Sequence, residues 1–257
     1  MTTPYVWLAG WFGLMVGSFL NVCIARLPTG ESIVSPPSTC PKCGRLINWR
    51  DNIPVVSYLI LGGKCRACSL PISVRYPLVE ATTAVLFMLQ AMAEPAPGVH
   101  LASRLVLTAL LVALAVTDFE TFRLPNPLTF GGLAAGLVFA LFTTPGITDA
   151  VIGAALGAGI LLLIRWGWLR ATGKDAMGLG DVKMLAMIGA FLGWQQVFVV
   201  LLLSTLAGAV VGIGLTVAGR GSMGSKLPFG VFLAIAALVA SLVGDSLLAW
   251  YLGLMDV

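Results

Sequence analysis

Residues 101–118 read LASRLVLTALLVALAVTD, an apolar stretch with one basic residue, Arg104, near its start and one acidic residue, Asp118, at its end. A membrane-spanning helix needs about 20 mostly apolar residues, so this stretch is long enough to be one. The whole chain has 257 residues, of which 58% are hydrophobic and 10% charged, and its mean hydropathy is +0.98. Soluble domains carry about 25% charged residues. Charge therefore cannot cover this surface, and the sequence predicts an all-α integral membrane protein surrounded by lipid.

The same apolar pattern recurs along the chain and predicts a polytopic bundle of about eight transmembrane helices. We expect them near residues 5–25, 77–94, 101–118, 126–143, 147–168, 179–194, 196–218 and 228–250. The first has no basic region before it and no small-residue cleavage site after it, so we expect a retained span rather than a signal peptide. Glycine pairs four residues apart, such as Gly13/Gly17 and Gly153/Gly157, predict close packing of these helices.

The distribution of basic residues predicts the orientation in the membrane. Seven of them lie in segment 26–76, seven more follow odd-numbered spans, and only Arg104 falls on the other side. The fourteen that agree are Arg26, Lys42, Arg45, Arg50, Lys64, Arg66, Arg75, Arg123, Arg165, Arg170, Lys174, Lys183, Arg220 and Lys226. Because basic loops stay in the cytoplasm, we expect segment 26–76 inside and both termini outside. The net charge of +4 is thus a topology signal, and we expect no nucleic-acid partner.

These features divide the chain into a first span (1–25), a cytoplasmic loop domain (26–76) and a transmembrane bundle (77–257). The loop domain contains two CxxC pairs, which together are Cys40, Cys43, Cys65 and Cys68. Four thiolates form a closed tetrahedral zinc site that stabilises a fold and leaves no open position for catalysis. Two disulfides are the alternative, but the cytoplasm is reducing. We therefore predict a structural Zn²⁺ in this loop.

Two acidic residues stand at the ends of predicted spans, Asp118 after the third and Asp181 at the start of the sixth. An ionisable residue at this depth is a functional hypothesis by default. The expected topology puts both at the cytoplasmic face, where two carboxylates can act as an aspartyl protease pair: one takes a proton from water while the other polarises the scissile carbonyl. Gly178 and Gly180 are expected to let the backbone turn sharply and an extended substrate approach. The alternative is that each Asp is an ordinary interfacial residue.

Several longer motifs run in order from the first span to the last: Gly17-Ser-Phe-Leu-Asn21-Val, Pro37-Ser-Thr-Cys40-Pro-Lys-Cys43-Gly44, Asp51-Asn-Ile-Pro54-Val-Val-Ser57-Tyr, Gly63-Lys-Cys65-Arg-Ala-Cys68, Ile72-Ser-Val-Arg75-Tyr76-Pro77-Leu-Val-Glu80, Gly178-Leu-Gly180-Asp181-Val-Lys183 and Pro228-Phe229-Gly230. With these motifs the chain resembles the prepilin peptidases, also called type IV leader peptidases. Two positions depart from the pattern. Asn126 stands where many relatives have Asp, and Val231 where many have Pro; we expect neither to touch the aspartate pair.

The resemblance implies a bifunctional enzyme of the bacterial inner membrane. Such enzymes cut the leader from pilin-like or pseudopilin precursors after a glycine, and then N-methylate the new amino terminus with S-adenosylmethionine. Asp118 and Asp181 match the catalytic pair of the family, with Gly178, Gly180 and Lys183 as its supporting motif. The cysteine loop matches the zinc module that goes with the methyltransferase half.

Residues that contact the methyl donor are less evident, because the loop has no Rossmann fingerprint. The candidates are Gly62, Gly63, Asn21, Arg75, Tyr76 and Glu80, of which Arg75, Tyr76 and Glu80 form the best cluster, at the membrane edge. Each has an ordinary structural alternative, such as a turn glycine or an Arg75–Glu80 ion pair at a helix end. Two other functions stay open at this point: a protease without methyltransferase activity, and a non-enzymatic membrane assembly factor with a zinc docking loop.

Overall fold

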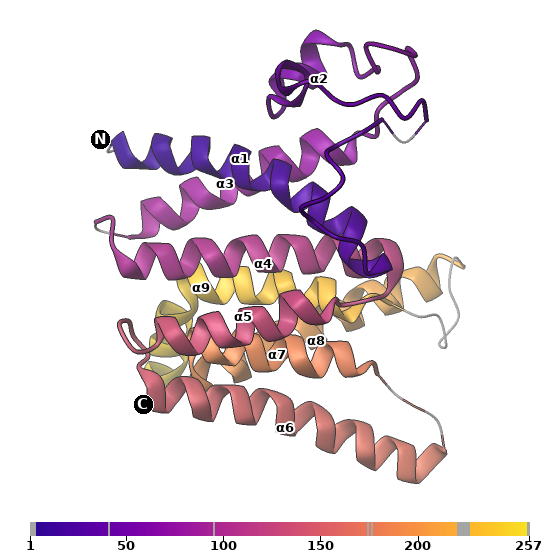
Figure 1. Ribbon diagram of the computed structural model, residues 1–257. Coiled ribbons are helices and arrows are strands. Elements are labelled where there is room, and N and C mark those ends of the chain that lie inside the picture. The colour runs from indigo at the N-terminus through magenta and orange to yellow at the C-terminus, as the bar shows by residue number, and fades with distance from the viewer. Residues whose placement is uncertain are drawn as a thin grey trace. The chain divides into compact units, whose positions relative to one another are not determined.

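The computed structural model describes residues 4–40, 42–94, 96–173, 175, 177–219 and 227–255. These residues form helices, two isolated β-bridges and no strand (Figure 1). Lys174, Arg220 and Lys226, which contributed to the expected orientation, lie outside this part. The helices are α1 (Pro4–Arg26), α2 (Val56–Ile60), α3 (Arg75–Ala93), α4 (Val99–Thr121), α5 (Asn126–Phe139), α6 (Ile147–Thr172), α7 (Leu179–Leu192), α8 (Trp194–Val217) and α9 (Phe229–Met255), with short 3₁₀ turns η1 (Leu27–Thr29) and η2 (Trp49–Asn52). The predicted all-α membrane fold is confirmed.

A helix occupies each of the eight predicted spans, but the helices differ in length. Within the described residues, α1, α3, α4, α6, α8 and α9 are long and apolar enough to cross a membrane. The other two, α5 and α7, have 14 residues each. At about 1.5 Å per residue such a helix is shorter than the roughly 30 Å hydrocarbon core. Six helices therefore meet the criteria for a full span, and two cover only part of that depth.

Contacts between residues divide the chain into two compact units, Met1–Pro97 and Gly98–Val257. In the first, α1 packs along α3, and the loop segment with η2 and α2 connects them. Glycine makes this approach possible: a Cβ at Gly13 would lie 2.7 Å from Ala84 Cα, and one at Gly17 would lie 2.7 Å from Glu80 Cα. The predicted close packing is confirmed here. The structural boundary follows Pro97, so α3 belongs to the same unit as α1. The functional boundaries after residues 25 and 76 stay predictions.

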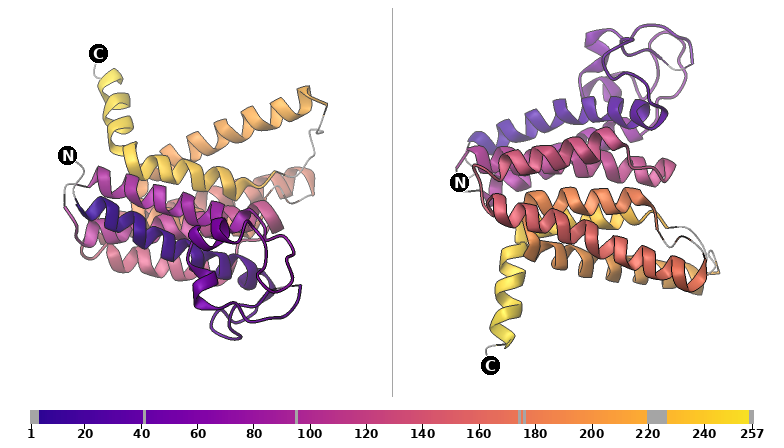
Figure 2. Two further views of the ribbon diagram at one scale, coloured as in Figure 1. Left: turned by 90° about the horizontal axis from the view of Figure 1, so that it is seen from above. Right: turned by 60° about the horizontal axis from the view of Figure 1, so that its bottom comes forward.

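In the second unit α7 is the most enclosed helix, with every residue from Asp181 to Phe191 buried except Lys183. A helix that is apolar on all sides belongs in an interior. It packs against α5, α6, α8 and α9. Its contact with α6 is backbone to backbone, since a Cβ at Gly153 or Gly189 would overlap the carbonyl group of the other glycine. The long outer helix α9 changes direction in its C-terminal half (Figure 2).

The ends of three helices follow from single residues. Phe122 adopts a left-handed conformation (φ 53°) that ends α4, and its N–H donates to the Asp118 carbonyl oxygen at 2.9 Å. Pro125 then precedes the first turn of α5. Gly193 (φ 82°) ends α7, and its missing side chain leaves room for Pro145. The last turn of α4 and the first turn of α7, where the two predicted catalytic residues lie, belong to the same unit.

Candidate functional site

Asp118 lies in the last turn of α4, and only 5% of its surface is exposed. The backbone N–H groups of Gly230 and Val231, in the first turn of α9, face its carboxylate. The first N–H groups of a helix have no partner within the helix and carry partial positive charge. The Asp118 Oδ2 atom has no hydrogen-bond partner among the described residues. The carboxylate is therefore held at a helix N-terminus with one oxygen free to accept a proton or a water.

Asp181 lies in the first turn of α7 and is 9% exposed. Its carboxylate faces backbone N–H groups at the start of its own helix, those of Gly178 and Asp181. The Asp118 and Asp181 carboxylates are close enough to interact electrostatically. Both belong to the second unit, and α4 and α7 are in contact. The structure thus brings together two buried carboxylates from distant parts of the sequence, each at a helix N-terminus.

Glycine before Asp181 serves a different purpose from the sharp turn that we expected. Gly178 has ordinary extended dihedrals (φ −73°, ψ 149°) and Gly180 is helical, so neither needs glycine for a sharp turn. At Gly180 the reason is space: a Cβ there would lie 3.0 Å from Leu124 Cβ. Leu124 follows directly after the turn that ends α4. The missing side chain lets the first turn of α7 approach the segment that carries Asp118.

This packing gives a prediction about Gly180. We expect Gly180→Ala to lower the rate of the cleavage predicted for this site roughly 3- to 10-fold, because the new methyl group forces Leu124 and the first turn of α7 slightly apart and catalysis is sensitive to small displacements. The measurement is the initial cleavage rate in detergent. Gly159→Ala is the matched control, since a Cβ at Gly159 meets nothing within 4 Å. Equal rates for the two variants would contradict this role of Gly180.

Lys183 points toward α5 rather than toward the carboxylates. Its ammonium donates to Asn126 Oδ1 and lies 5.5 Å from the centre of the Phe130 ring. It therefore ties the start of α7 to the start of α5. The two positions that depart from the family pattern also lie here. Asn126 accepts this hydrogen bond, and the Val231 N–H, which donates to the Pro228 carbonyl oxygen at 3.2 Å, lies close enough to Asp118 to affect its carboxylate. The expectation that neither departure touches the pair is wrong for Val231.

The four predicted zinc ligands lie together in the first unit. Their sulfur atoms are all within 4.8 Å of one another, and Cys40 Sγ lies 3.9 Å from Cys68 Sγ. A tetrahedral zinc with bonds of about 2.3 Å places its sulfurs about 3.8 Å apart. A disulfide would require about 2.05 Å. The four thiols therefore fit a Cys₄ zinc site and do not form disulfides.

The two CxxC pairs have the same backbone construction. In the first, the Cys40 N–H donates to the Arg45 carbonyl and the Gly44 N–H to the Cys40 carbonyl, both at 2.9 Å. In the second, Cys65 donates to Leu70 and Ser69 to Cys65, also at 2.9 Å. Gly44 (φ 70°) and Ser69 (φ 55°) occupy equivalent left-handed positions. Each turn therefore presents two thiols in the same direction, as a zinc site requires.

Backbone N–H groups inside these turns favour thiolate ligands. Those of Cys43 and Lys42 lower the pKa of the Cys40 thiol to about 6. Those of Cys68 and Ala67 lower the pKa of Cys65 in the same way. A thiol with a lowered pKa loses its proton more readily, and the thiolate is the form that binds a metal.

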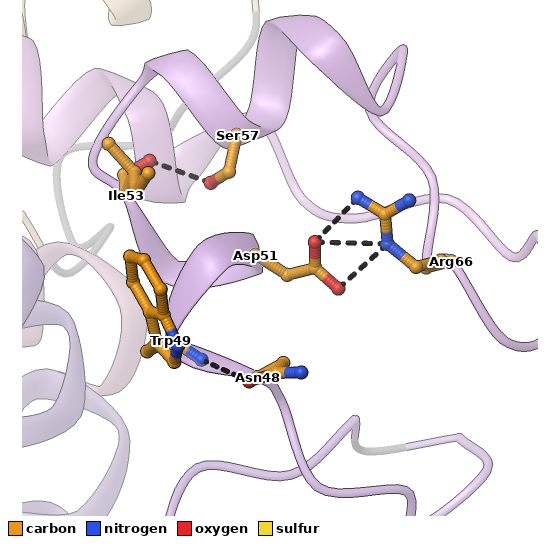
Figure 3. Close-up of polar contacts among 6 residues, drawn as sticks. All are labelled: Asn48, Trp49, Asp51, Ile53, Ser57 and Arg66. Carbon is orange, nitrogen blue, oxygen red and sulfur yellow. Dashed lines mark hydrogen bonds and ion pairs between the residues drawn. The ribbon is translucent and has the colours of Figure 1, made fainter.

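An ion pair that the sequence did not reveal fixes the second CxxC pair to the rest of the loop (Figure 3). Arg66 Nε lies 3.0 Å from both carboxylate oxygens of Asp51, and Arg66 Nη2 lies 2.7 Å from Oδ1. The Arg66 guanidinium lowers the pKa of Asp51. Nearby, Asn48 Oδ1 accepts the N–H of Trp49, and the Ser57 hydroxyl donates to the Ile53 carbonyl. These contacts hold the turn η2 next to the cysteine pair.

The candidates for methyl-donor contact all lie in the first unit. Gly63 (φ 68°) packs against the Tyr58 ring, where a Cβ would lie 2.9 Å from the hydroxyl oxygen. The Arg75 guanidinium stacks on the Tyr76 ring at 4.9 Å, at the start of α3. Glu80, one turn further, is buried and accepts the N–H of Val55 at 2.8 Å. The structure therefore places Arg75, Tyr76 and Glu80 in the first two turns of α3.

The chain matches two family models that together cover most of its length. Residues 11–93 match the Bacterial Peptidase A24 N-terminal domain, and residues 105–213 match the Type IV leader peptidase family. The two matches fall within the two structural units. No solved structure matches the chain.

Curated relatives match over nearly the whole chain. A protein of Aeromonas hydrophila is 44% identical over 268 aligned residues, which cover 94% of this chain and 91% of the relative. A protein of Pseudomonas putida is 40% identical, and the alignment covers 95% of this chain and 93% of the relative. A protein of Klebsiella pneumoniae is 44% identical, and the alignment covers 79% of this chain and 93% of the relative. All three are named prepilin leader peptidase/N-methyltransferase.

Proposed function

We infer the function of this chain from its family: it belongs to the type IV leader peptidase family, it cleaves prepilin-type precursors, and it N-methylates the cleaved product. It is a multi-pass protein of the inner membrane. We further propose that Asp118 and Asp181 perform the cleavage. The observation that carries this proposal is the pair itself, two buried carboxylates that interact within one unit.

The proposed reaction is hydrolysis without a covalent intermediate. Two neighbouring carboxylates in a poorly hydrated place share one proton. The ionised carboxylate takes a proton from water, the resulting hydroxide attacks the scissile carbonyl, and the protonated carboxyl donates a hydrogen bond to the carbonyl oxygen. The N–H groups of Gly230 and Val231 would orient Asp118 throughout. The bond cut is the one that follows a glycine at the end of the leader of a pilin-like or pseudopilin precursor.

The proposed orientation puts this chemistry at the cytoplasmic face and both termini outside. The support is the distribution of basic residues and the position of both aspartates at helix ends. A basic leader would then meet the acidic pair from the cytoplasm while the apolar part of the precursor stays in lipid.

For the methyltransferase half we propose that zinc has a structural role, because four thiolates fill its coordination shell. S-adenosylmethionine would supply the methyl group. Arg75 and Tyr76, which stack on each other at the start of α3, would line the place of the donor, and Gly63 would support the loop beside Tyr58.

The experiment that tests both activities uses purified enzyme and a pilin-like precursor, with and without methyl-labelled S-adenosylmethionine. We expect mass spectrometry to show a product shortened by the leader in both reactions, and a label on the new amino terminus only when the donor is present. Heat-inactivated enzyme is the control. An uncut precursor would contradict the proposed peptidase activity. A cut product that never gains label would show that the protein is a protease without methyltransferase activity.

A further inference from the structure

Two polar side chains are buried between α1 and α3, in the unit that does not contain the peptidase pair. Asn21 is 2% exposed and Glu80 is 7% exposed. Neither is a zinc ligand. A carboxylate buried within a membrane-spanning segment is costly, and by default such a group is retained for function.

Asn21 leaves one oxygen without a partner. Its amide nitrogen donates to the carbonyl oxygens of Gly17 at 3.3 Å and of Tyr76 at 3.1 Å. Its buried Oδ1 has no hydrogen-bond partner among the described residues. The two donor hydrogens are thus used within the protein, and an acceptor remains for a ligand that carries N–H groups.

Glu80 accepts a hydrogen bond from Val55, a residue with a strained backbone conformation. Its Oε2 accepts the N–H of Val55 at 2.8 Å, and the Ser18 hydroxyl lies near the same carboxylate. Val55 has φ +60°, which is unfavourable for a β-branched residue and persists only where the surroundings impose it. The Glu80 carboxylate is therefore held in place by a backbone N–H from the loop segment.

The Asn21 and Glu80 side chains lie at neighbouring heights along the α1–α3 helix pair. Gly17 packs against Glu80, and Asn21, one turn later, bonds to Tyr76, one turn earlier, so α1 and α3 are antiparallel. Helical side chains lean toward the N-terminus of their own helix. Asn21 therefore leans toward the level of Glu80, and Glu80 toward the level of Asn21. Two oxygen acceptors, one of them a carboxylate, thus lie about one helical turn apart along the same pair of helices.

We propose that Glu80 and Asn21 bind the free α-amino group of the cleaved substrate and that Glu80 removes its proton before methyl transfer. This inference rests on the proposed function. An ammonium group has no lone pair and cannot attack a methyl group, so a base is required. In an apolar place the neutral amine and carboxylic acid cost less to bury than two ions, which favours the proton transfer.

The atoms of this step balance. The proton moves from the ammonium nitrogen to a Glu80 oxygen, and the freed lone pair forms the new N–C bond. The bond from the methyl carbon to the sulfonium sulfur breaks, and its electron pair stays on sulfur. The product is a methylammonium group, and Glu80 then returns its proton to water.

The test separates this role from a structural one with Glu80→Gln, which keeps an oxygen for the Val55 N–H and removes the base. We expect methyl transfer to precut substrate to fall at least about 100-fold, the lower range for a general base. Precursor cleavage and zinc content should stay within twofold of wild type. The matched control is Thr83→Val, a buried polar residue of α3 whose hydroxyl bonds only within its helix, to Val79 at 2.7 Å.

A binding measurement tests the same site without the methyl donor. A synthetic peptide with the first residues of the cleaved precursor should bind wild-type protein about tenfold more tightly with a free amino terminus than with an acetylated one, the size expected for a charged hydrogen bond. Glu80→Gln should remove that difference. If wild type does not methylate, the proposed function fails. If wild type methylates and Glu80→Gln methylates equally, or the peptide difference persists, only this inference is overturned.

Discussion

Replacing Asp118 or Asp181 with Asn is expected to reduce precursor cleavage at least about 1,000-fold, because the two carboxylates share the work of one acid and one base. Asparagine has nearly the same shape, so packing at the helix ends is retained. It can neither take a proton from water nor give one to the carbonyl. The measurement is the initial rate of leader removal with purified enzyme in detergent.

The control for this prediction is Asp149→Asn, a change of the same kind in the first turn of α6. It should cut at the wild-type rate. Methyl transfer to precut substrate should also continue in both site variants, because the methyltransferase candidates lie in the other unit. Loss of both activities together would indicate general damage to the protein rather than loss of the peptidase pair.

Replacing Cys40 with Ser is expected to remove zinc and to abolish methyl transfer while precursor cleavage continues. Serine cannot supply a thiolate, and a structural zinc site contributes about 10–16 kcal/mol to the folding of a small domain. The first CxxC turn would lose the metal that holds it against the second. Metal analysis should fall from about one zinc per chain toward zero, and label transfer should become undetectable.

Cys23→Ala is the control, since Cys23 is a buried thiol of α1 outside the cluster. This variant should keep its zinc. A freshly prepared, active wild-type enzyme without zinc would contradict the predicted metal site. Full methyl transfer by a zinc-free Cys40→Ser variant would separate the metal from the methyltransferase.

The positions of the helices could be predicted from the sequence, because apolar runs of this length have few alternatives in a chain with so little charge. Their ends were less predictable. We expected a span over 126–143, whereas α5 ends at Phe139, and α6 continues to Thr172 beyond the expected residue 168. The residues that follow Phe139 are still apolar, so hydrophobicity has no step that marks the end of α5. Helix α6 instead continues through Arg165 and Arg170, which the hydropathy pattern placed at or beyond its end, and it ends where Gly173 adopts a left-handed conformation.

In the site as well, residue types can be read from the sequence, whereas contacts made by the backbone cannot. The sequence predicts the aspartates and the cysteines as site residues because charges are rare in spans and CxxC spacing is specific. The N–H groups of Gly230 and Val231 at Asp118 could not be predicted, because any non-proline residue carries an N–H. The start of an apolar run after Pro228 did indicate a helix N-terminus, but not which carboxylate it faces. Likewise Val55 gives no sign in the sequence that its peptide N–H reaches Glu80.

We propose that Asp118 and Asp181 act as one catalytic unit, and single-turnover cleavage with enzyme in excess tests this most directly. The precursor would be followed by mass spectrometry with wild type, each single Asn variant and the double variant. We expect wild type to convert all of the precursor, and the three variants to leave it intact to the same extent, since removing one member of the pair already removes the reaction. Cleavage by either single variant at a rate near that of wild type would contradict the account.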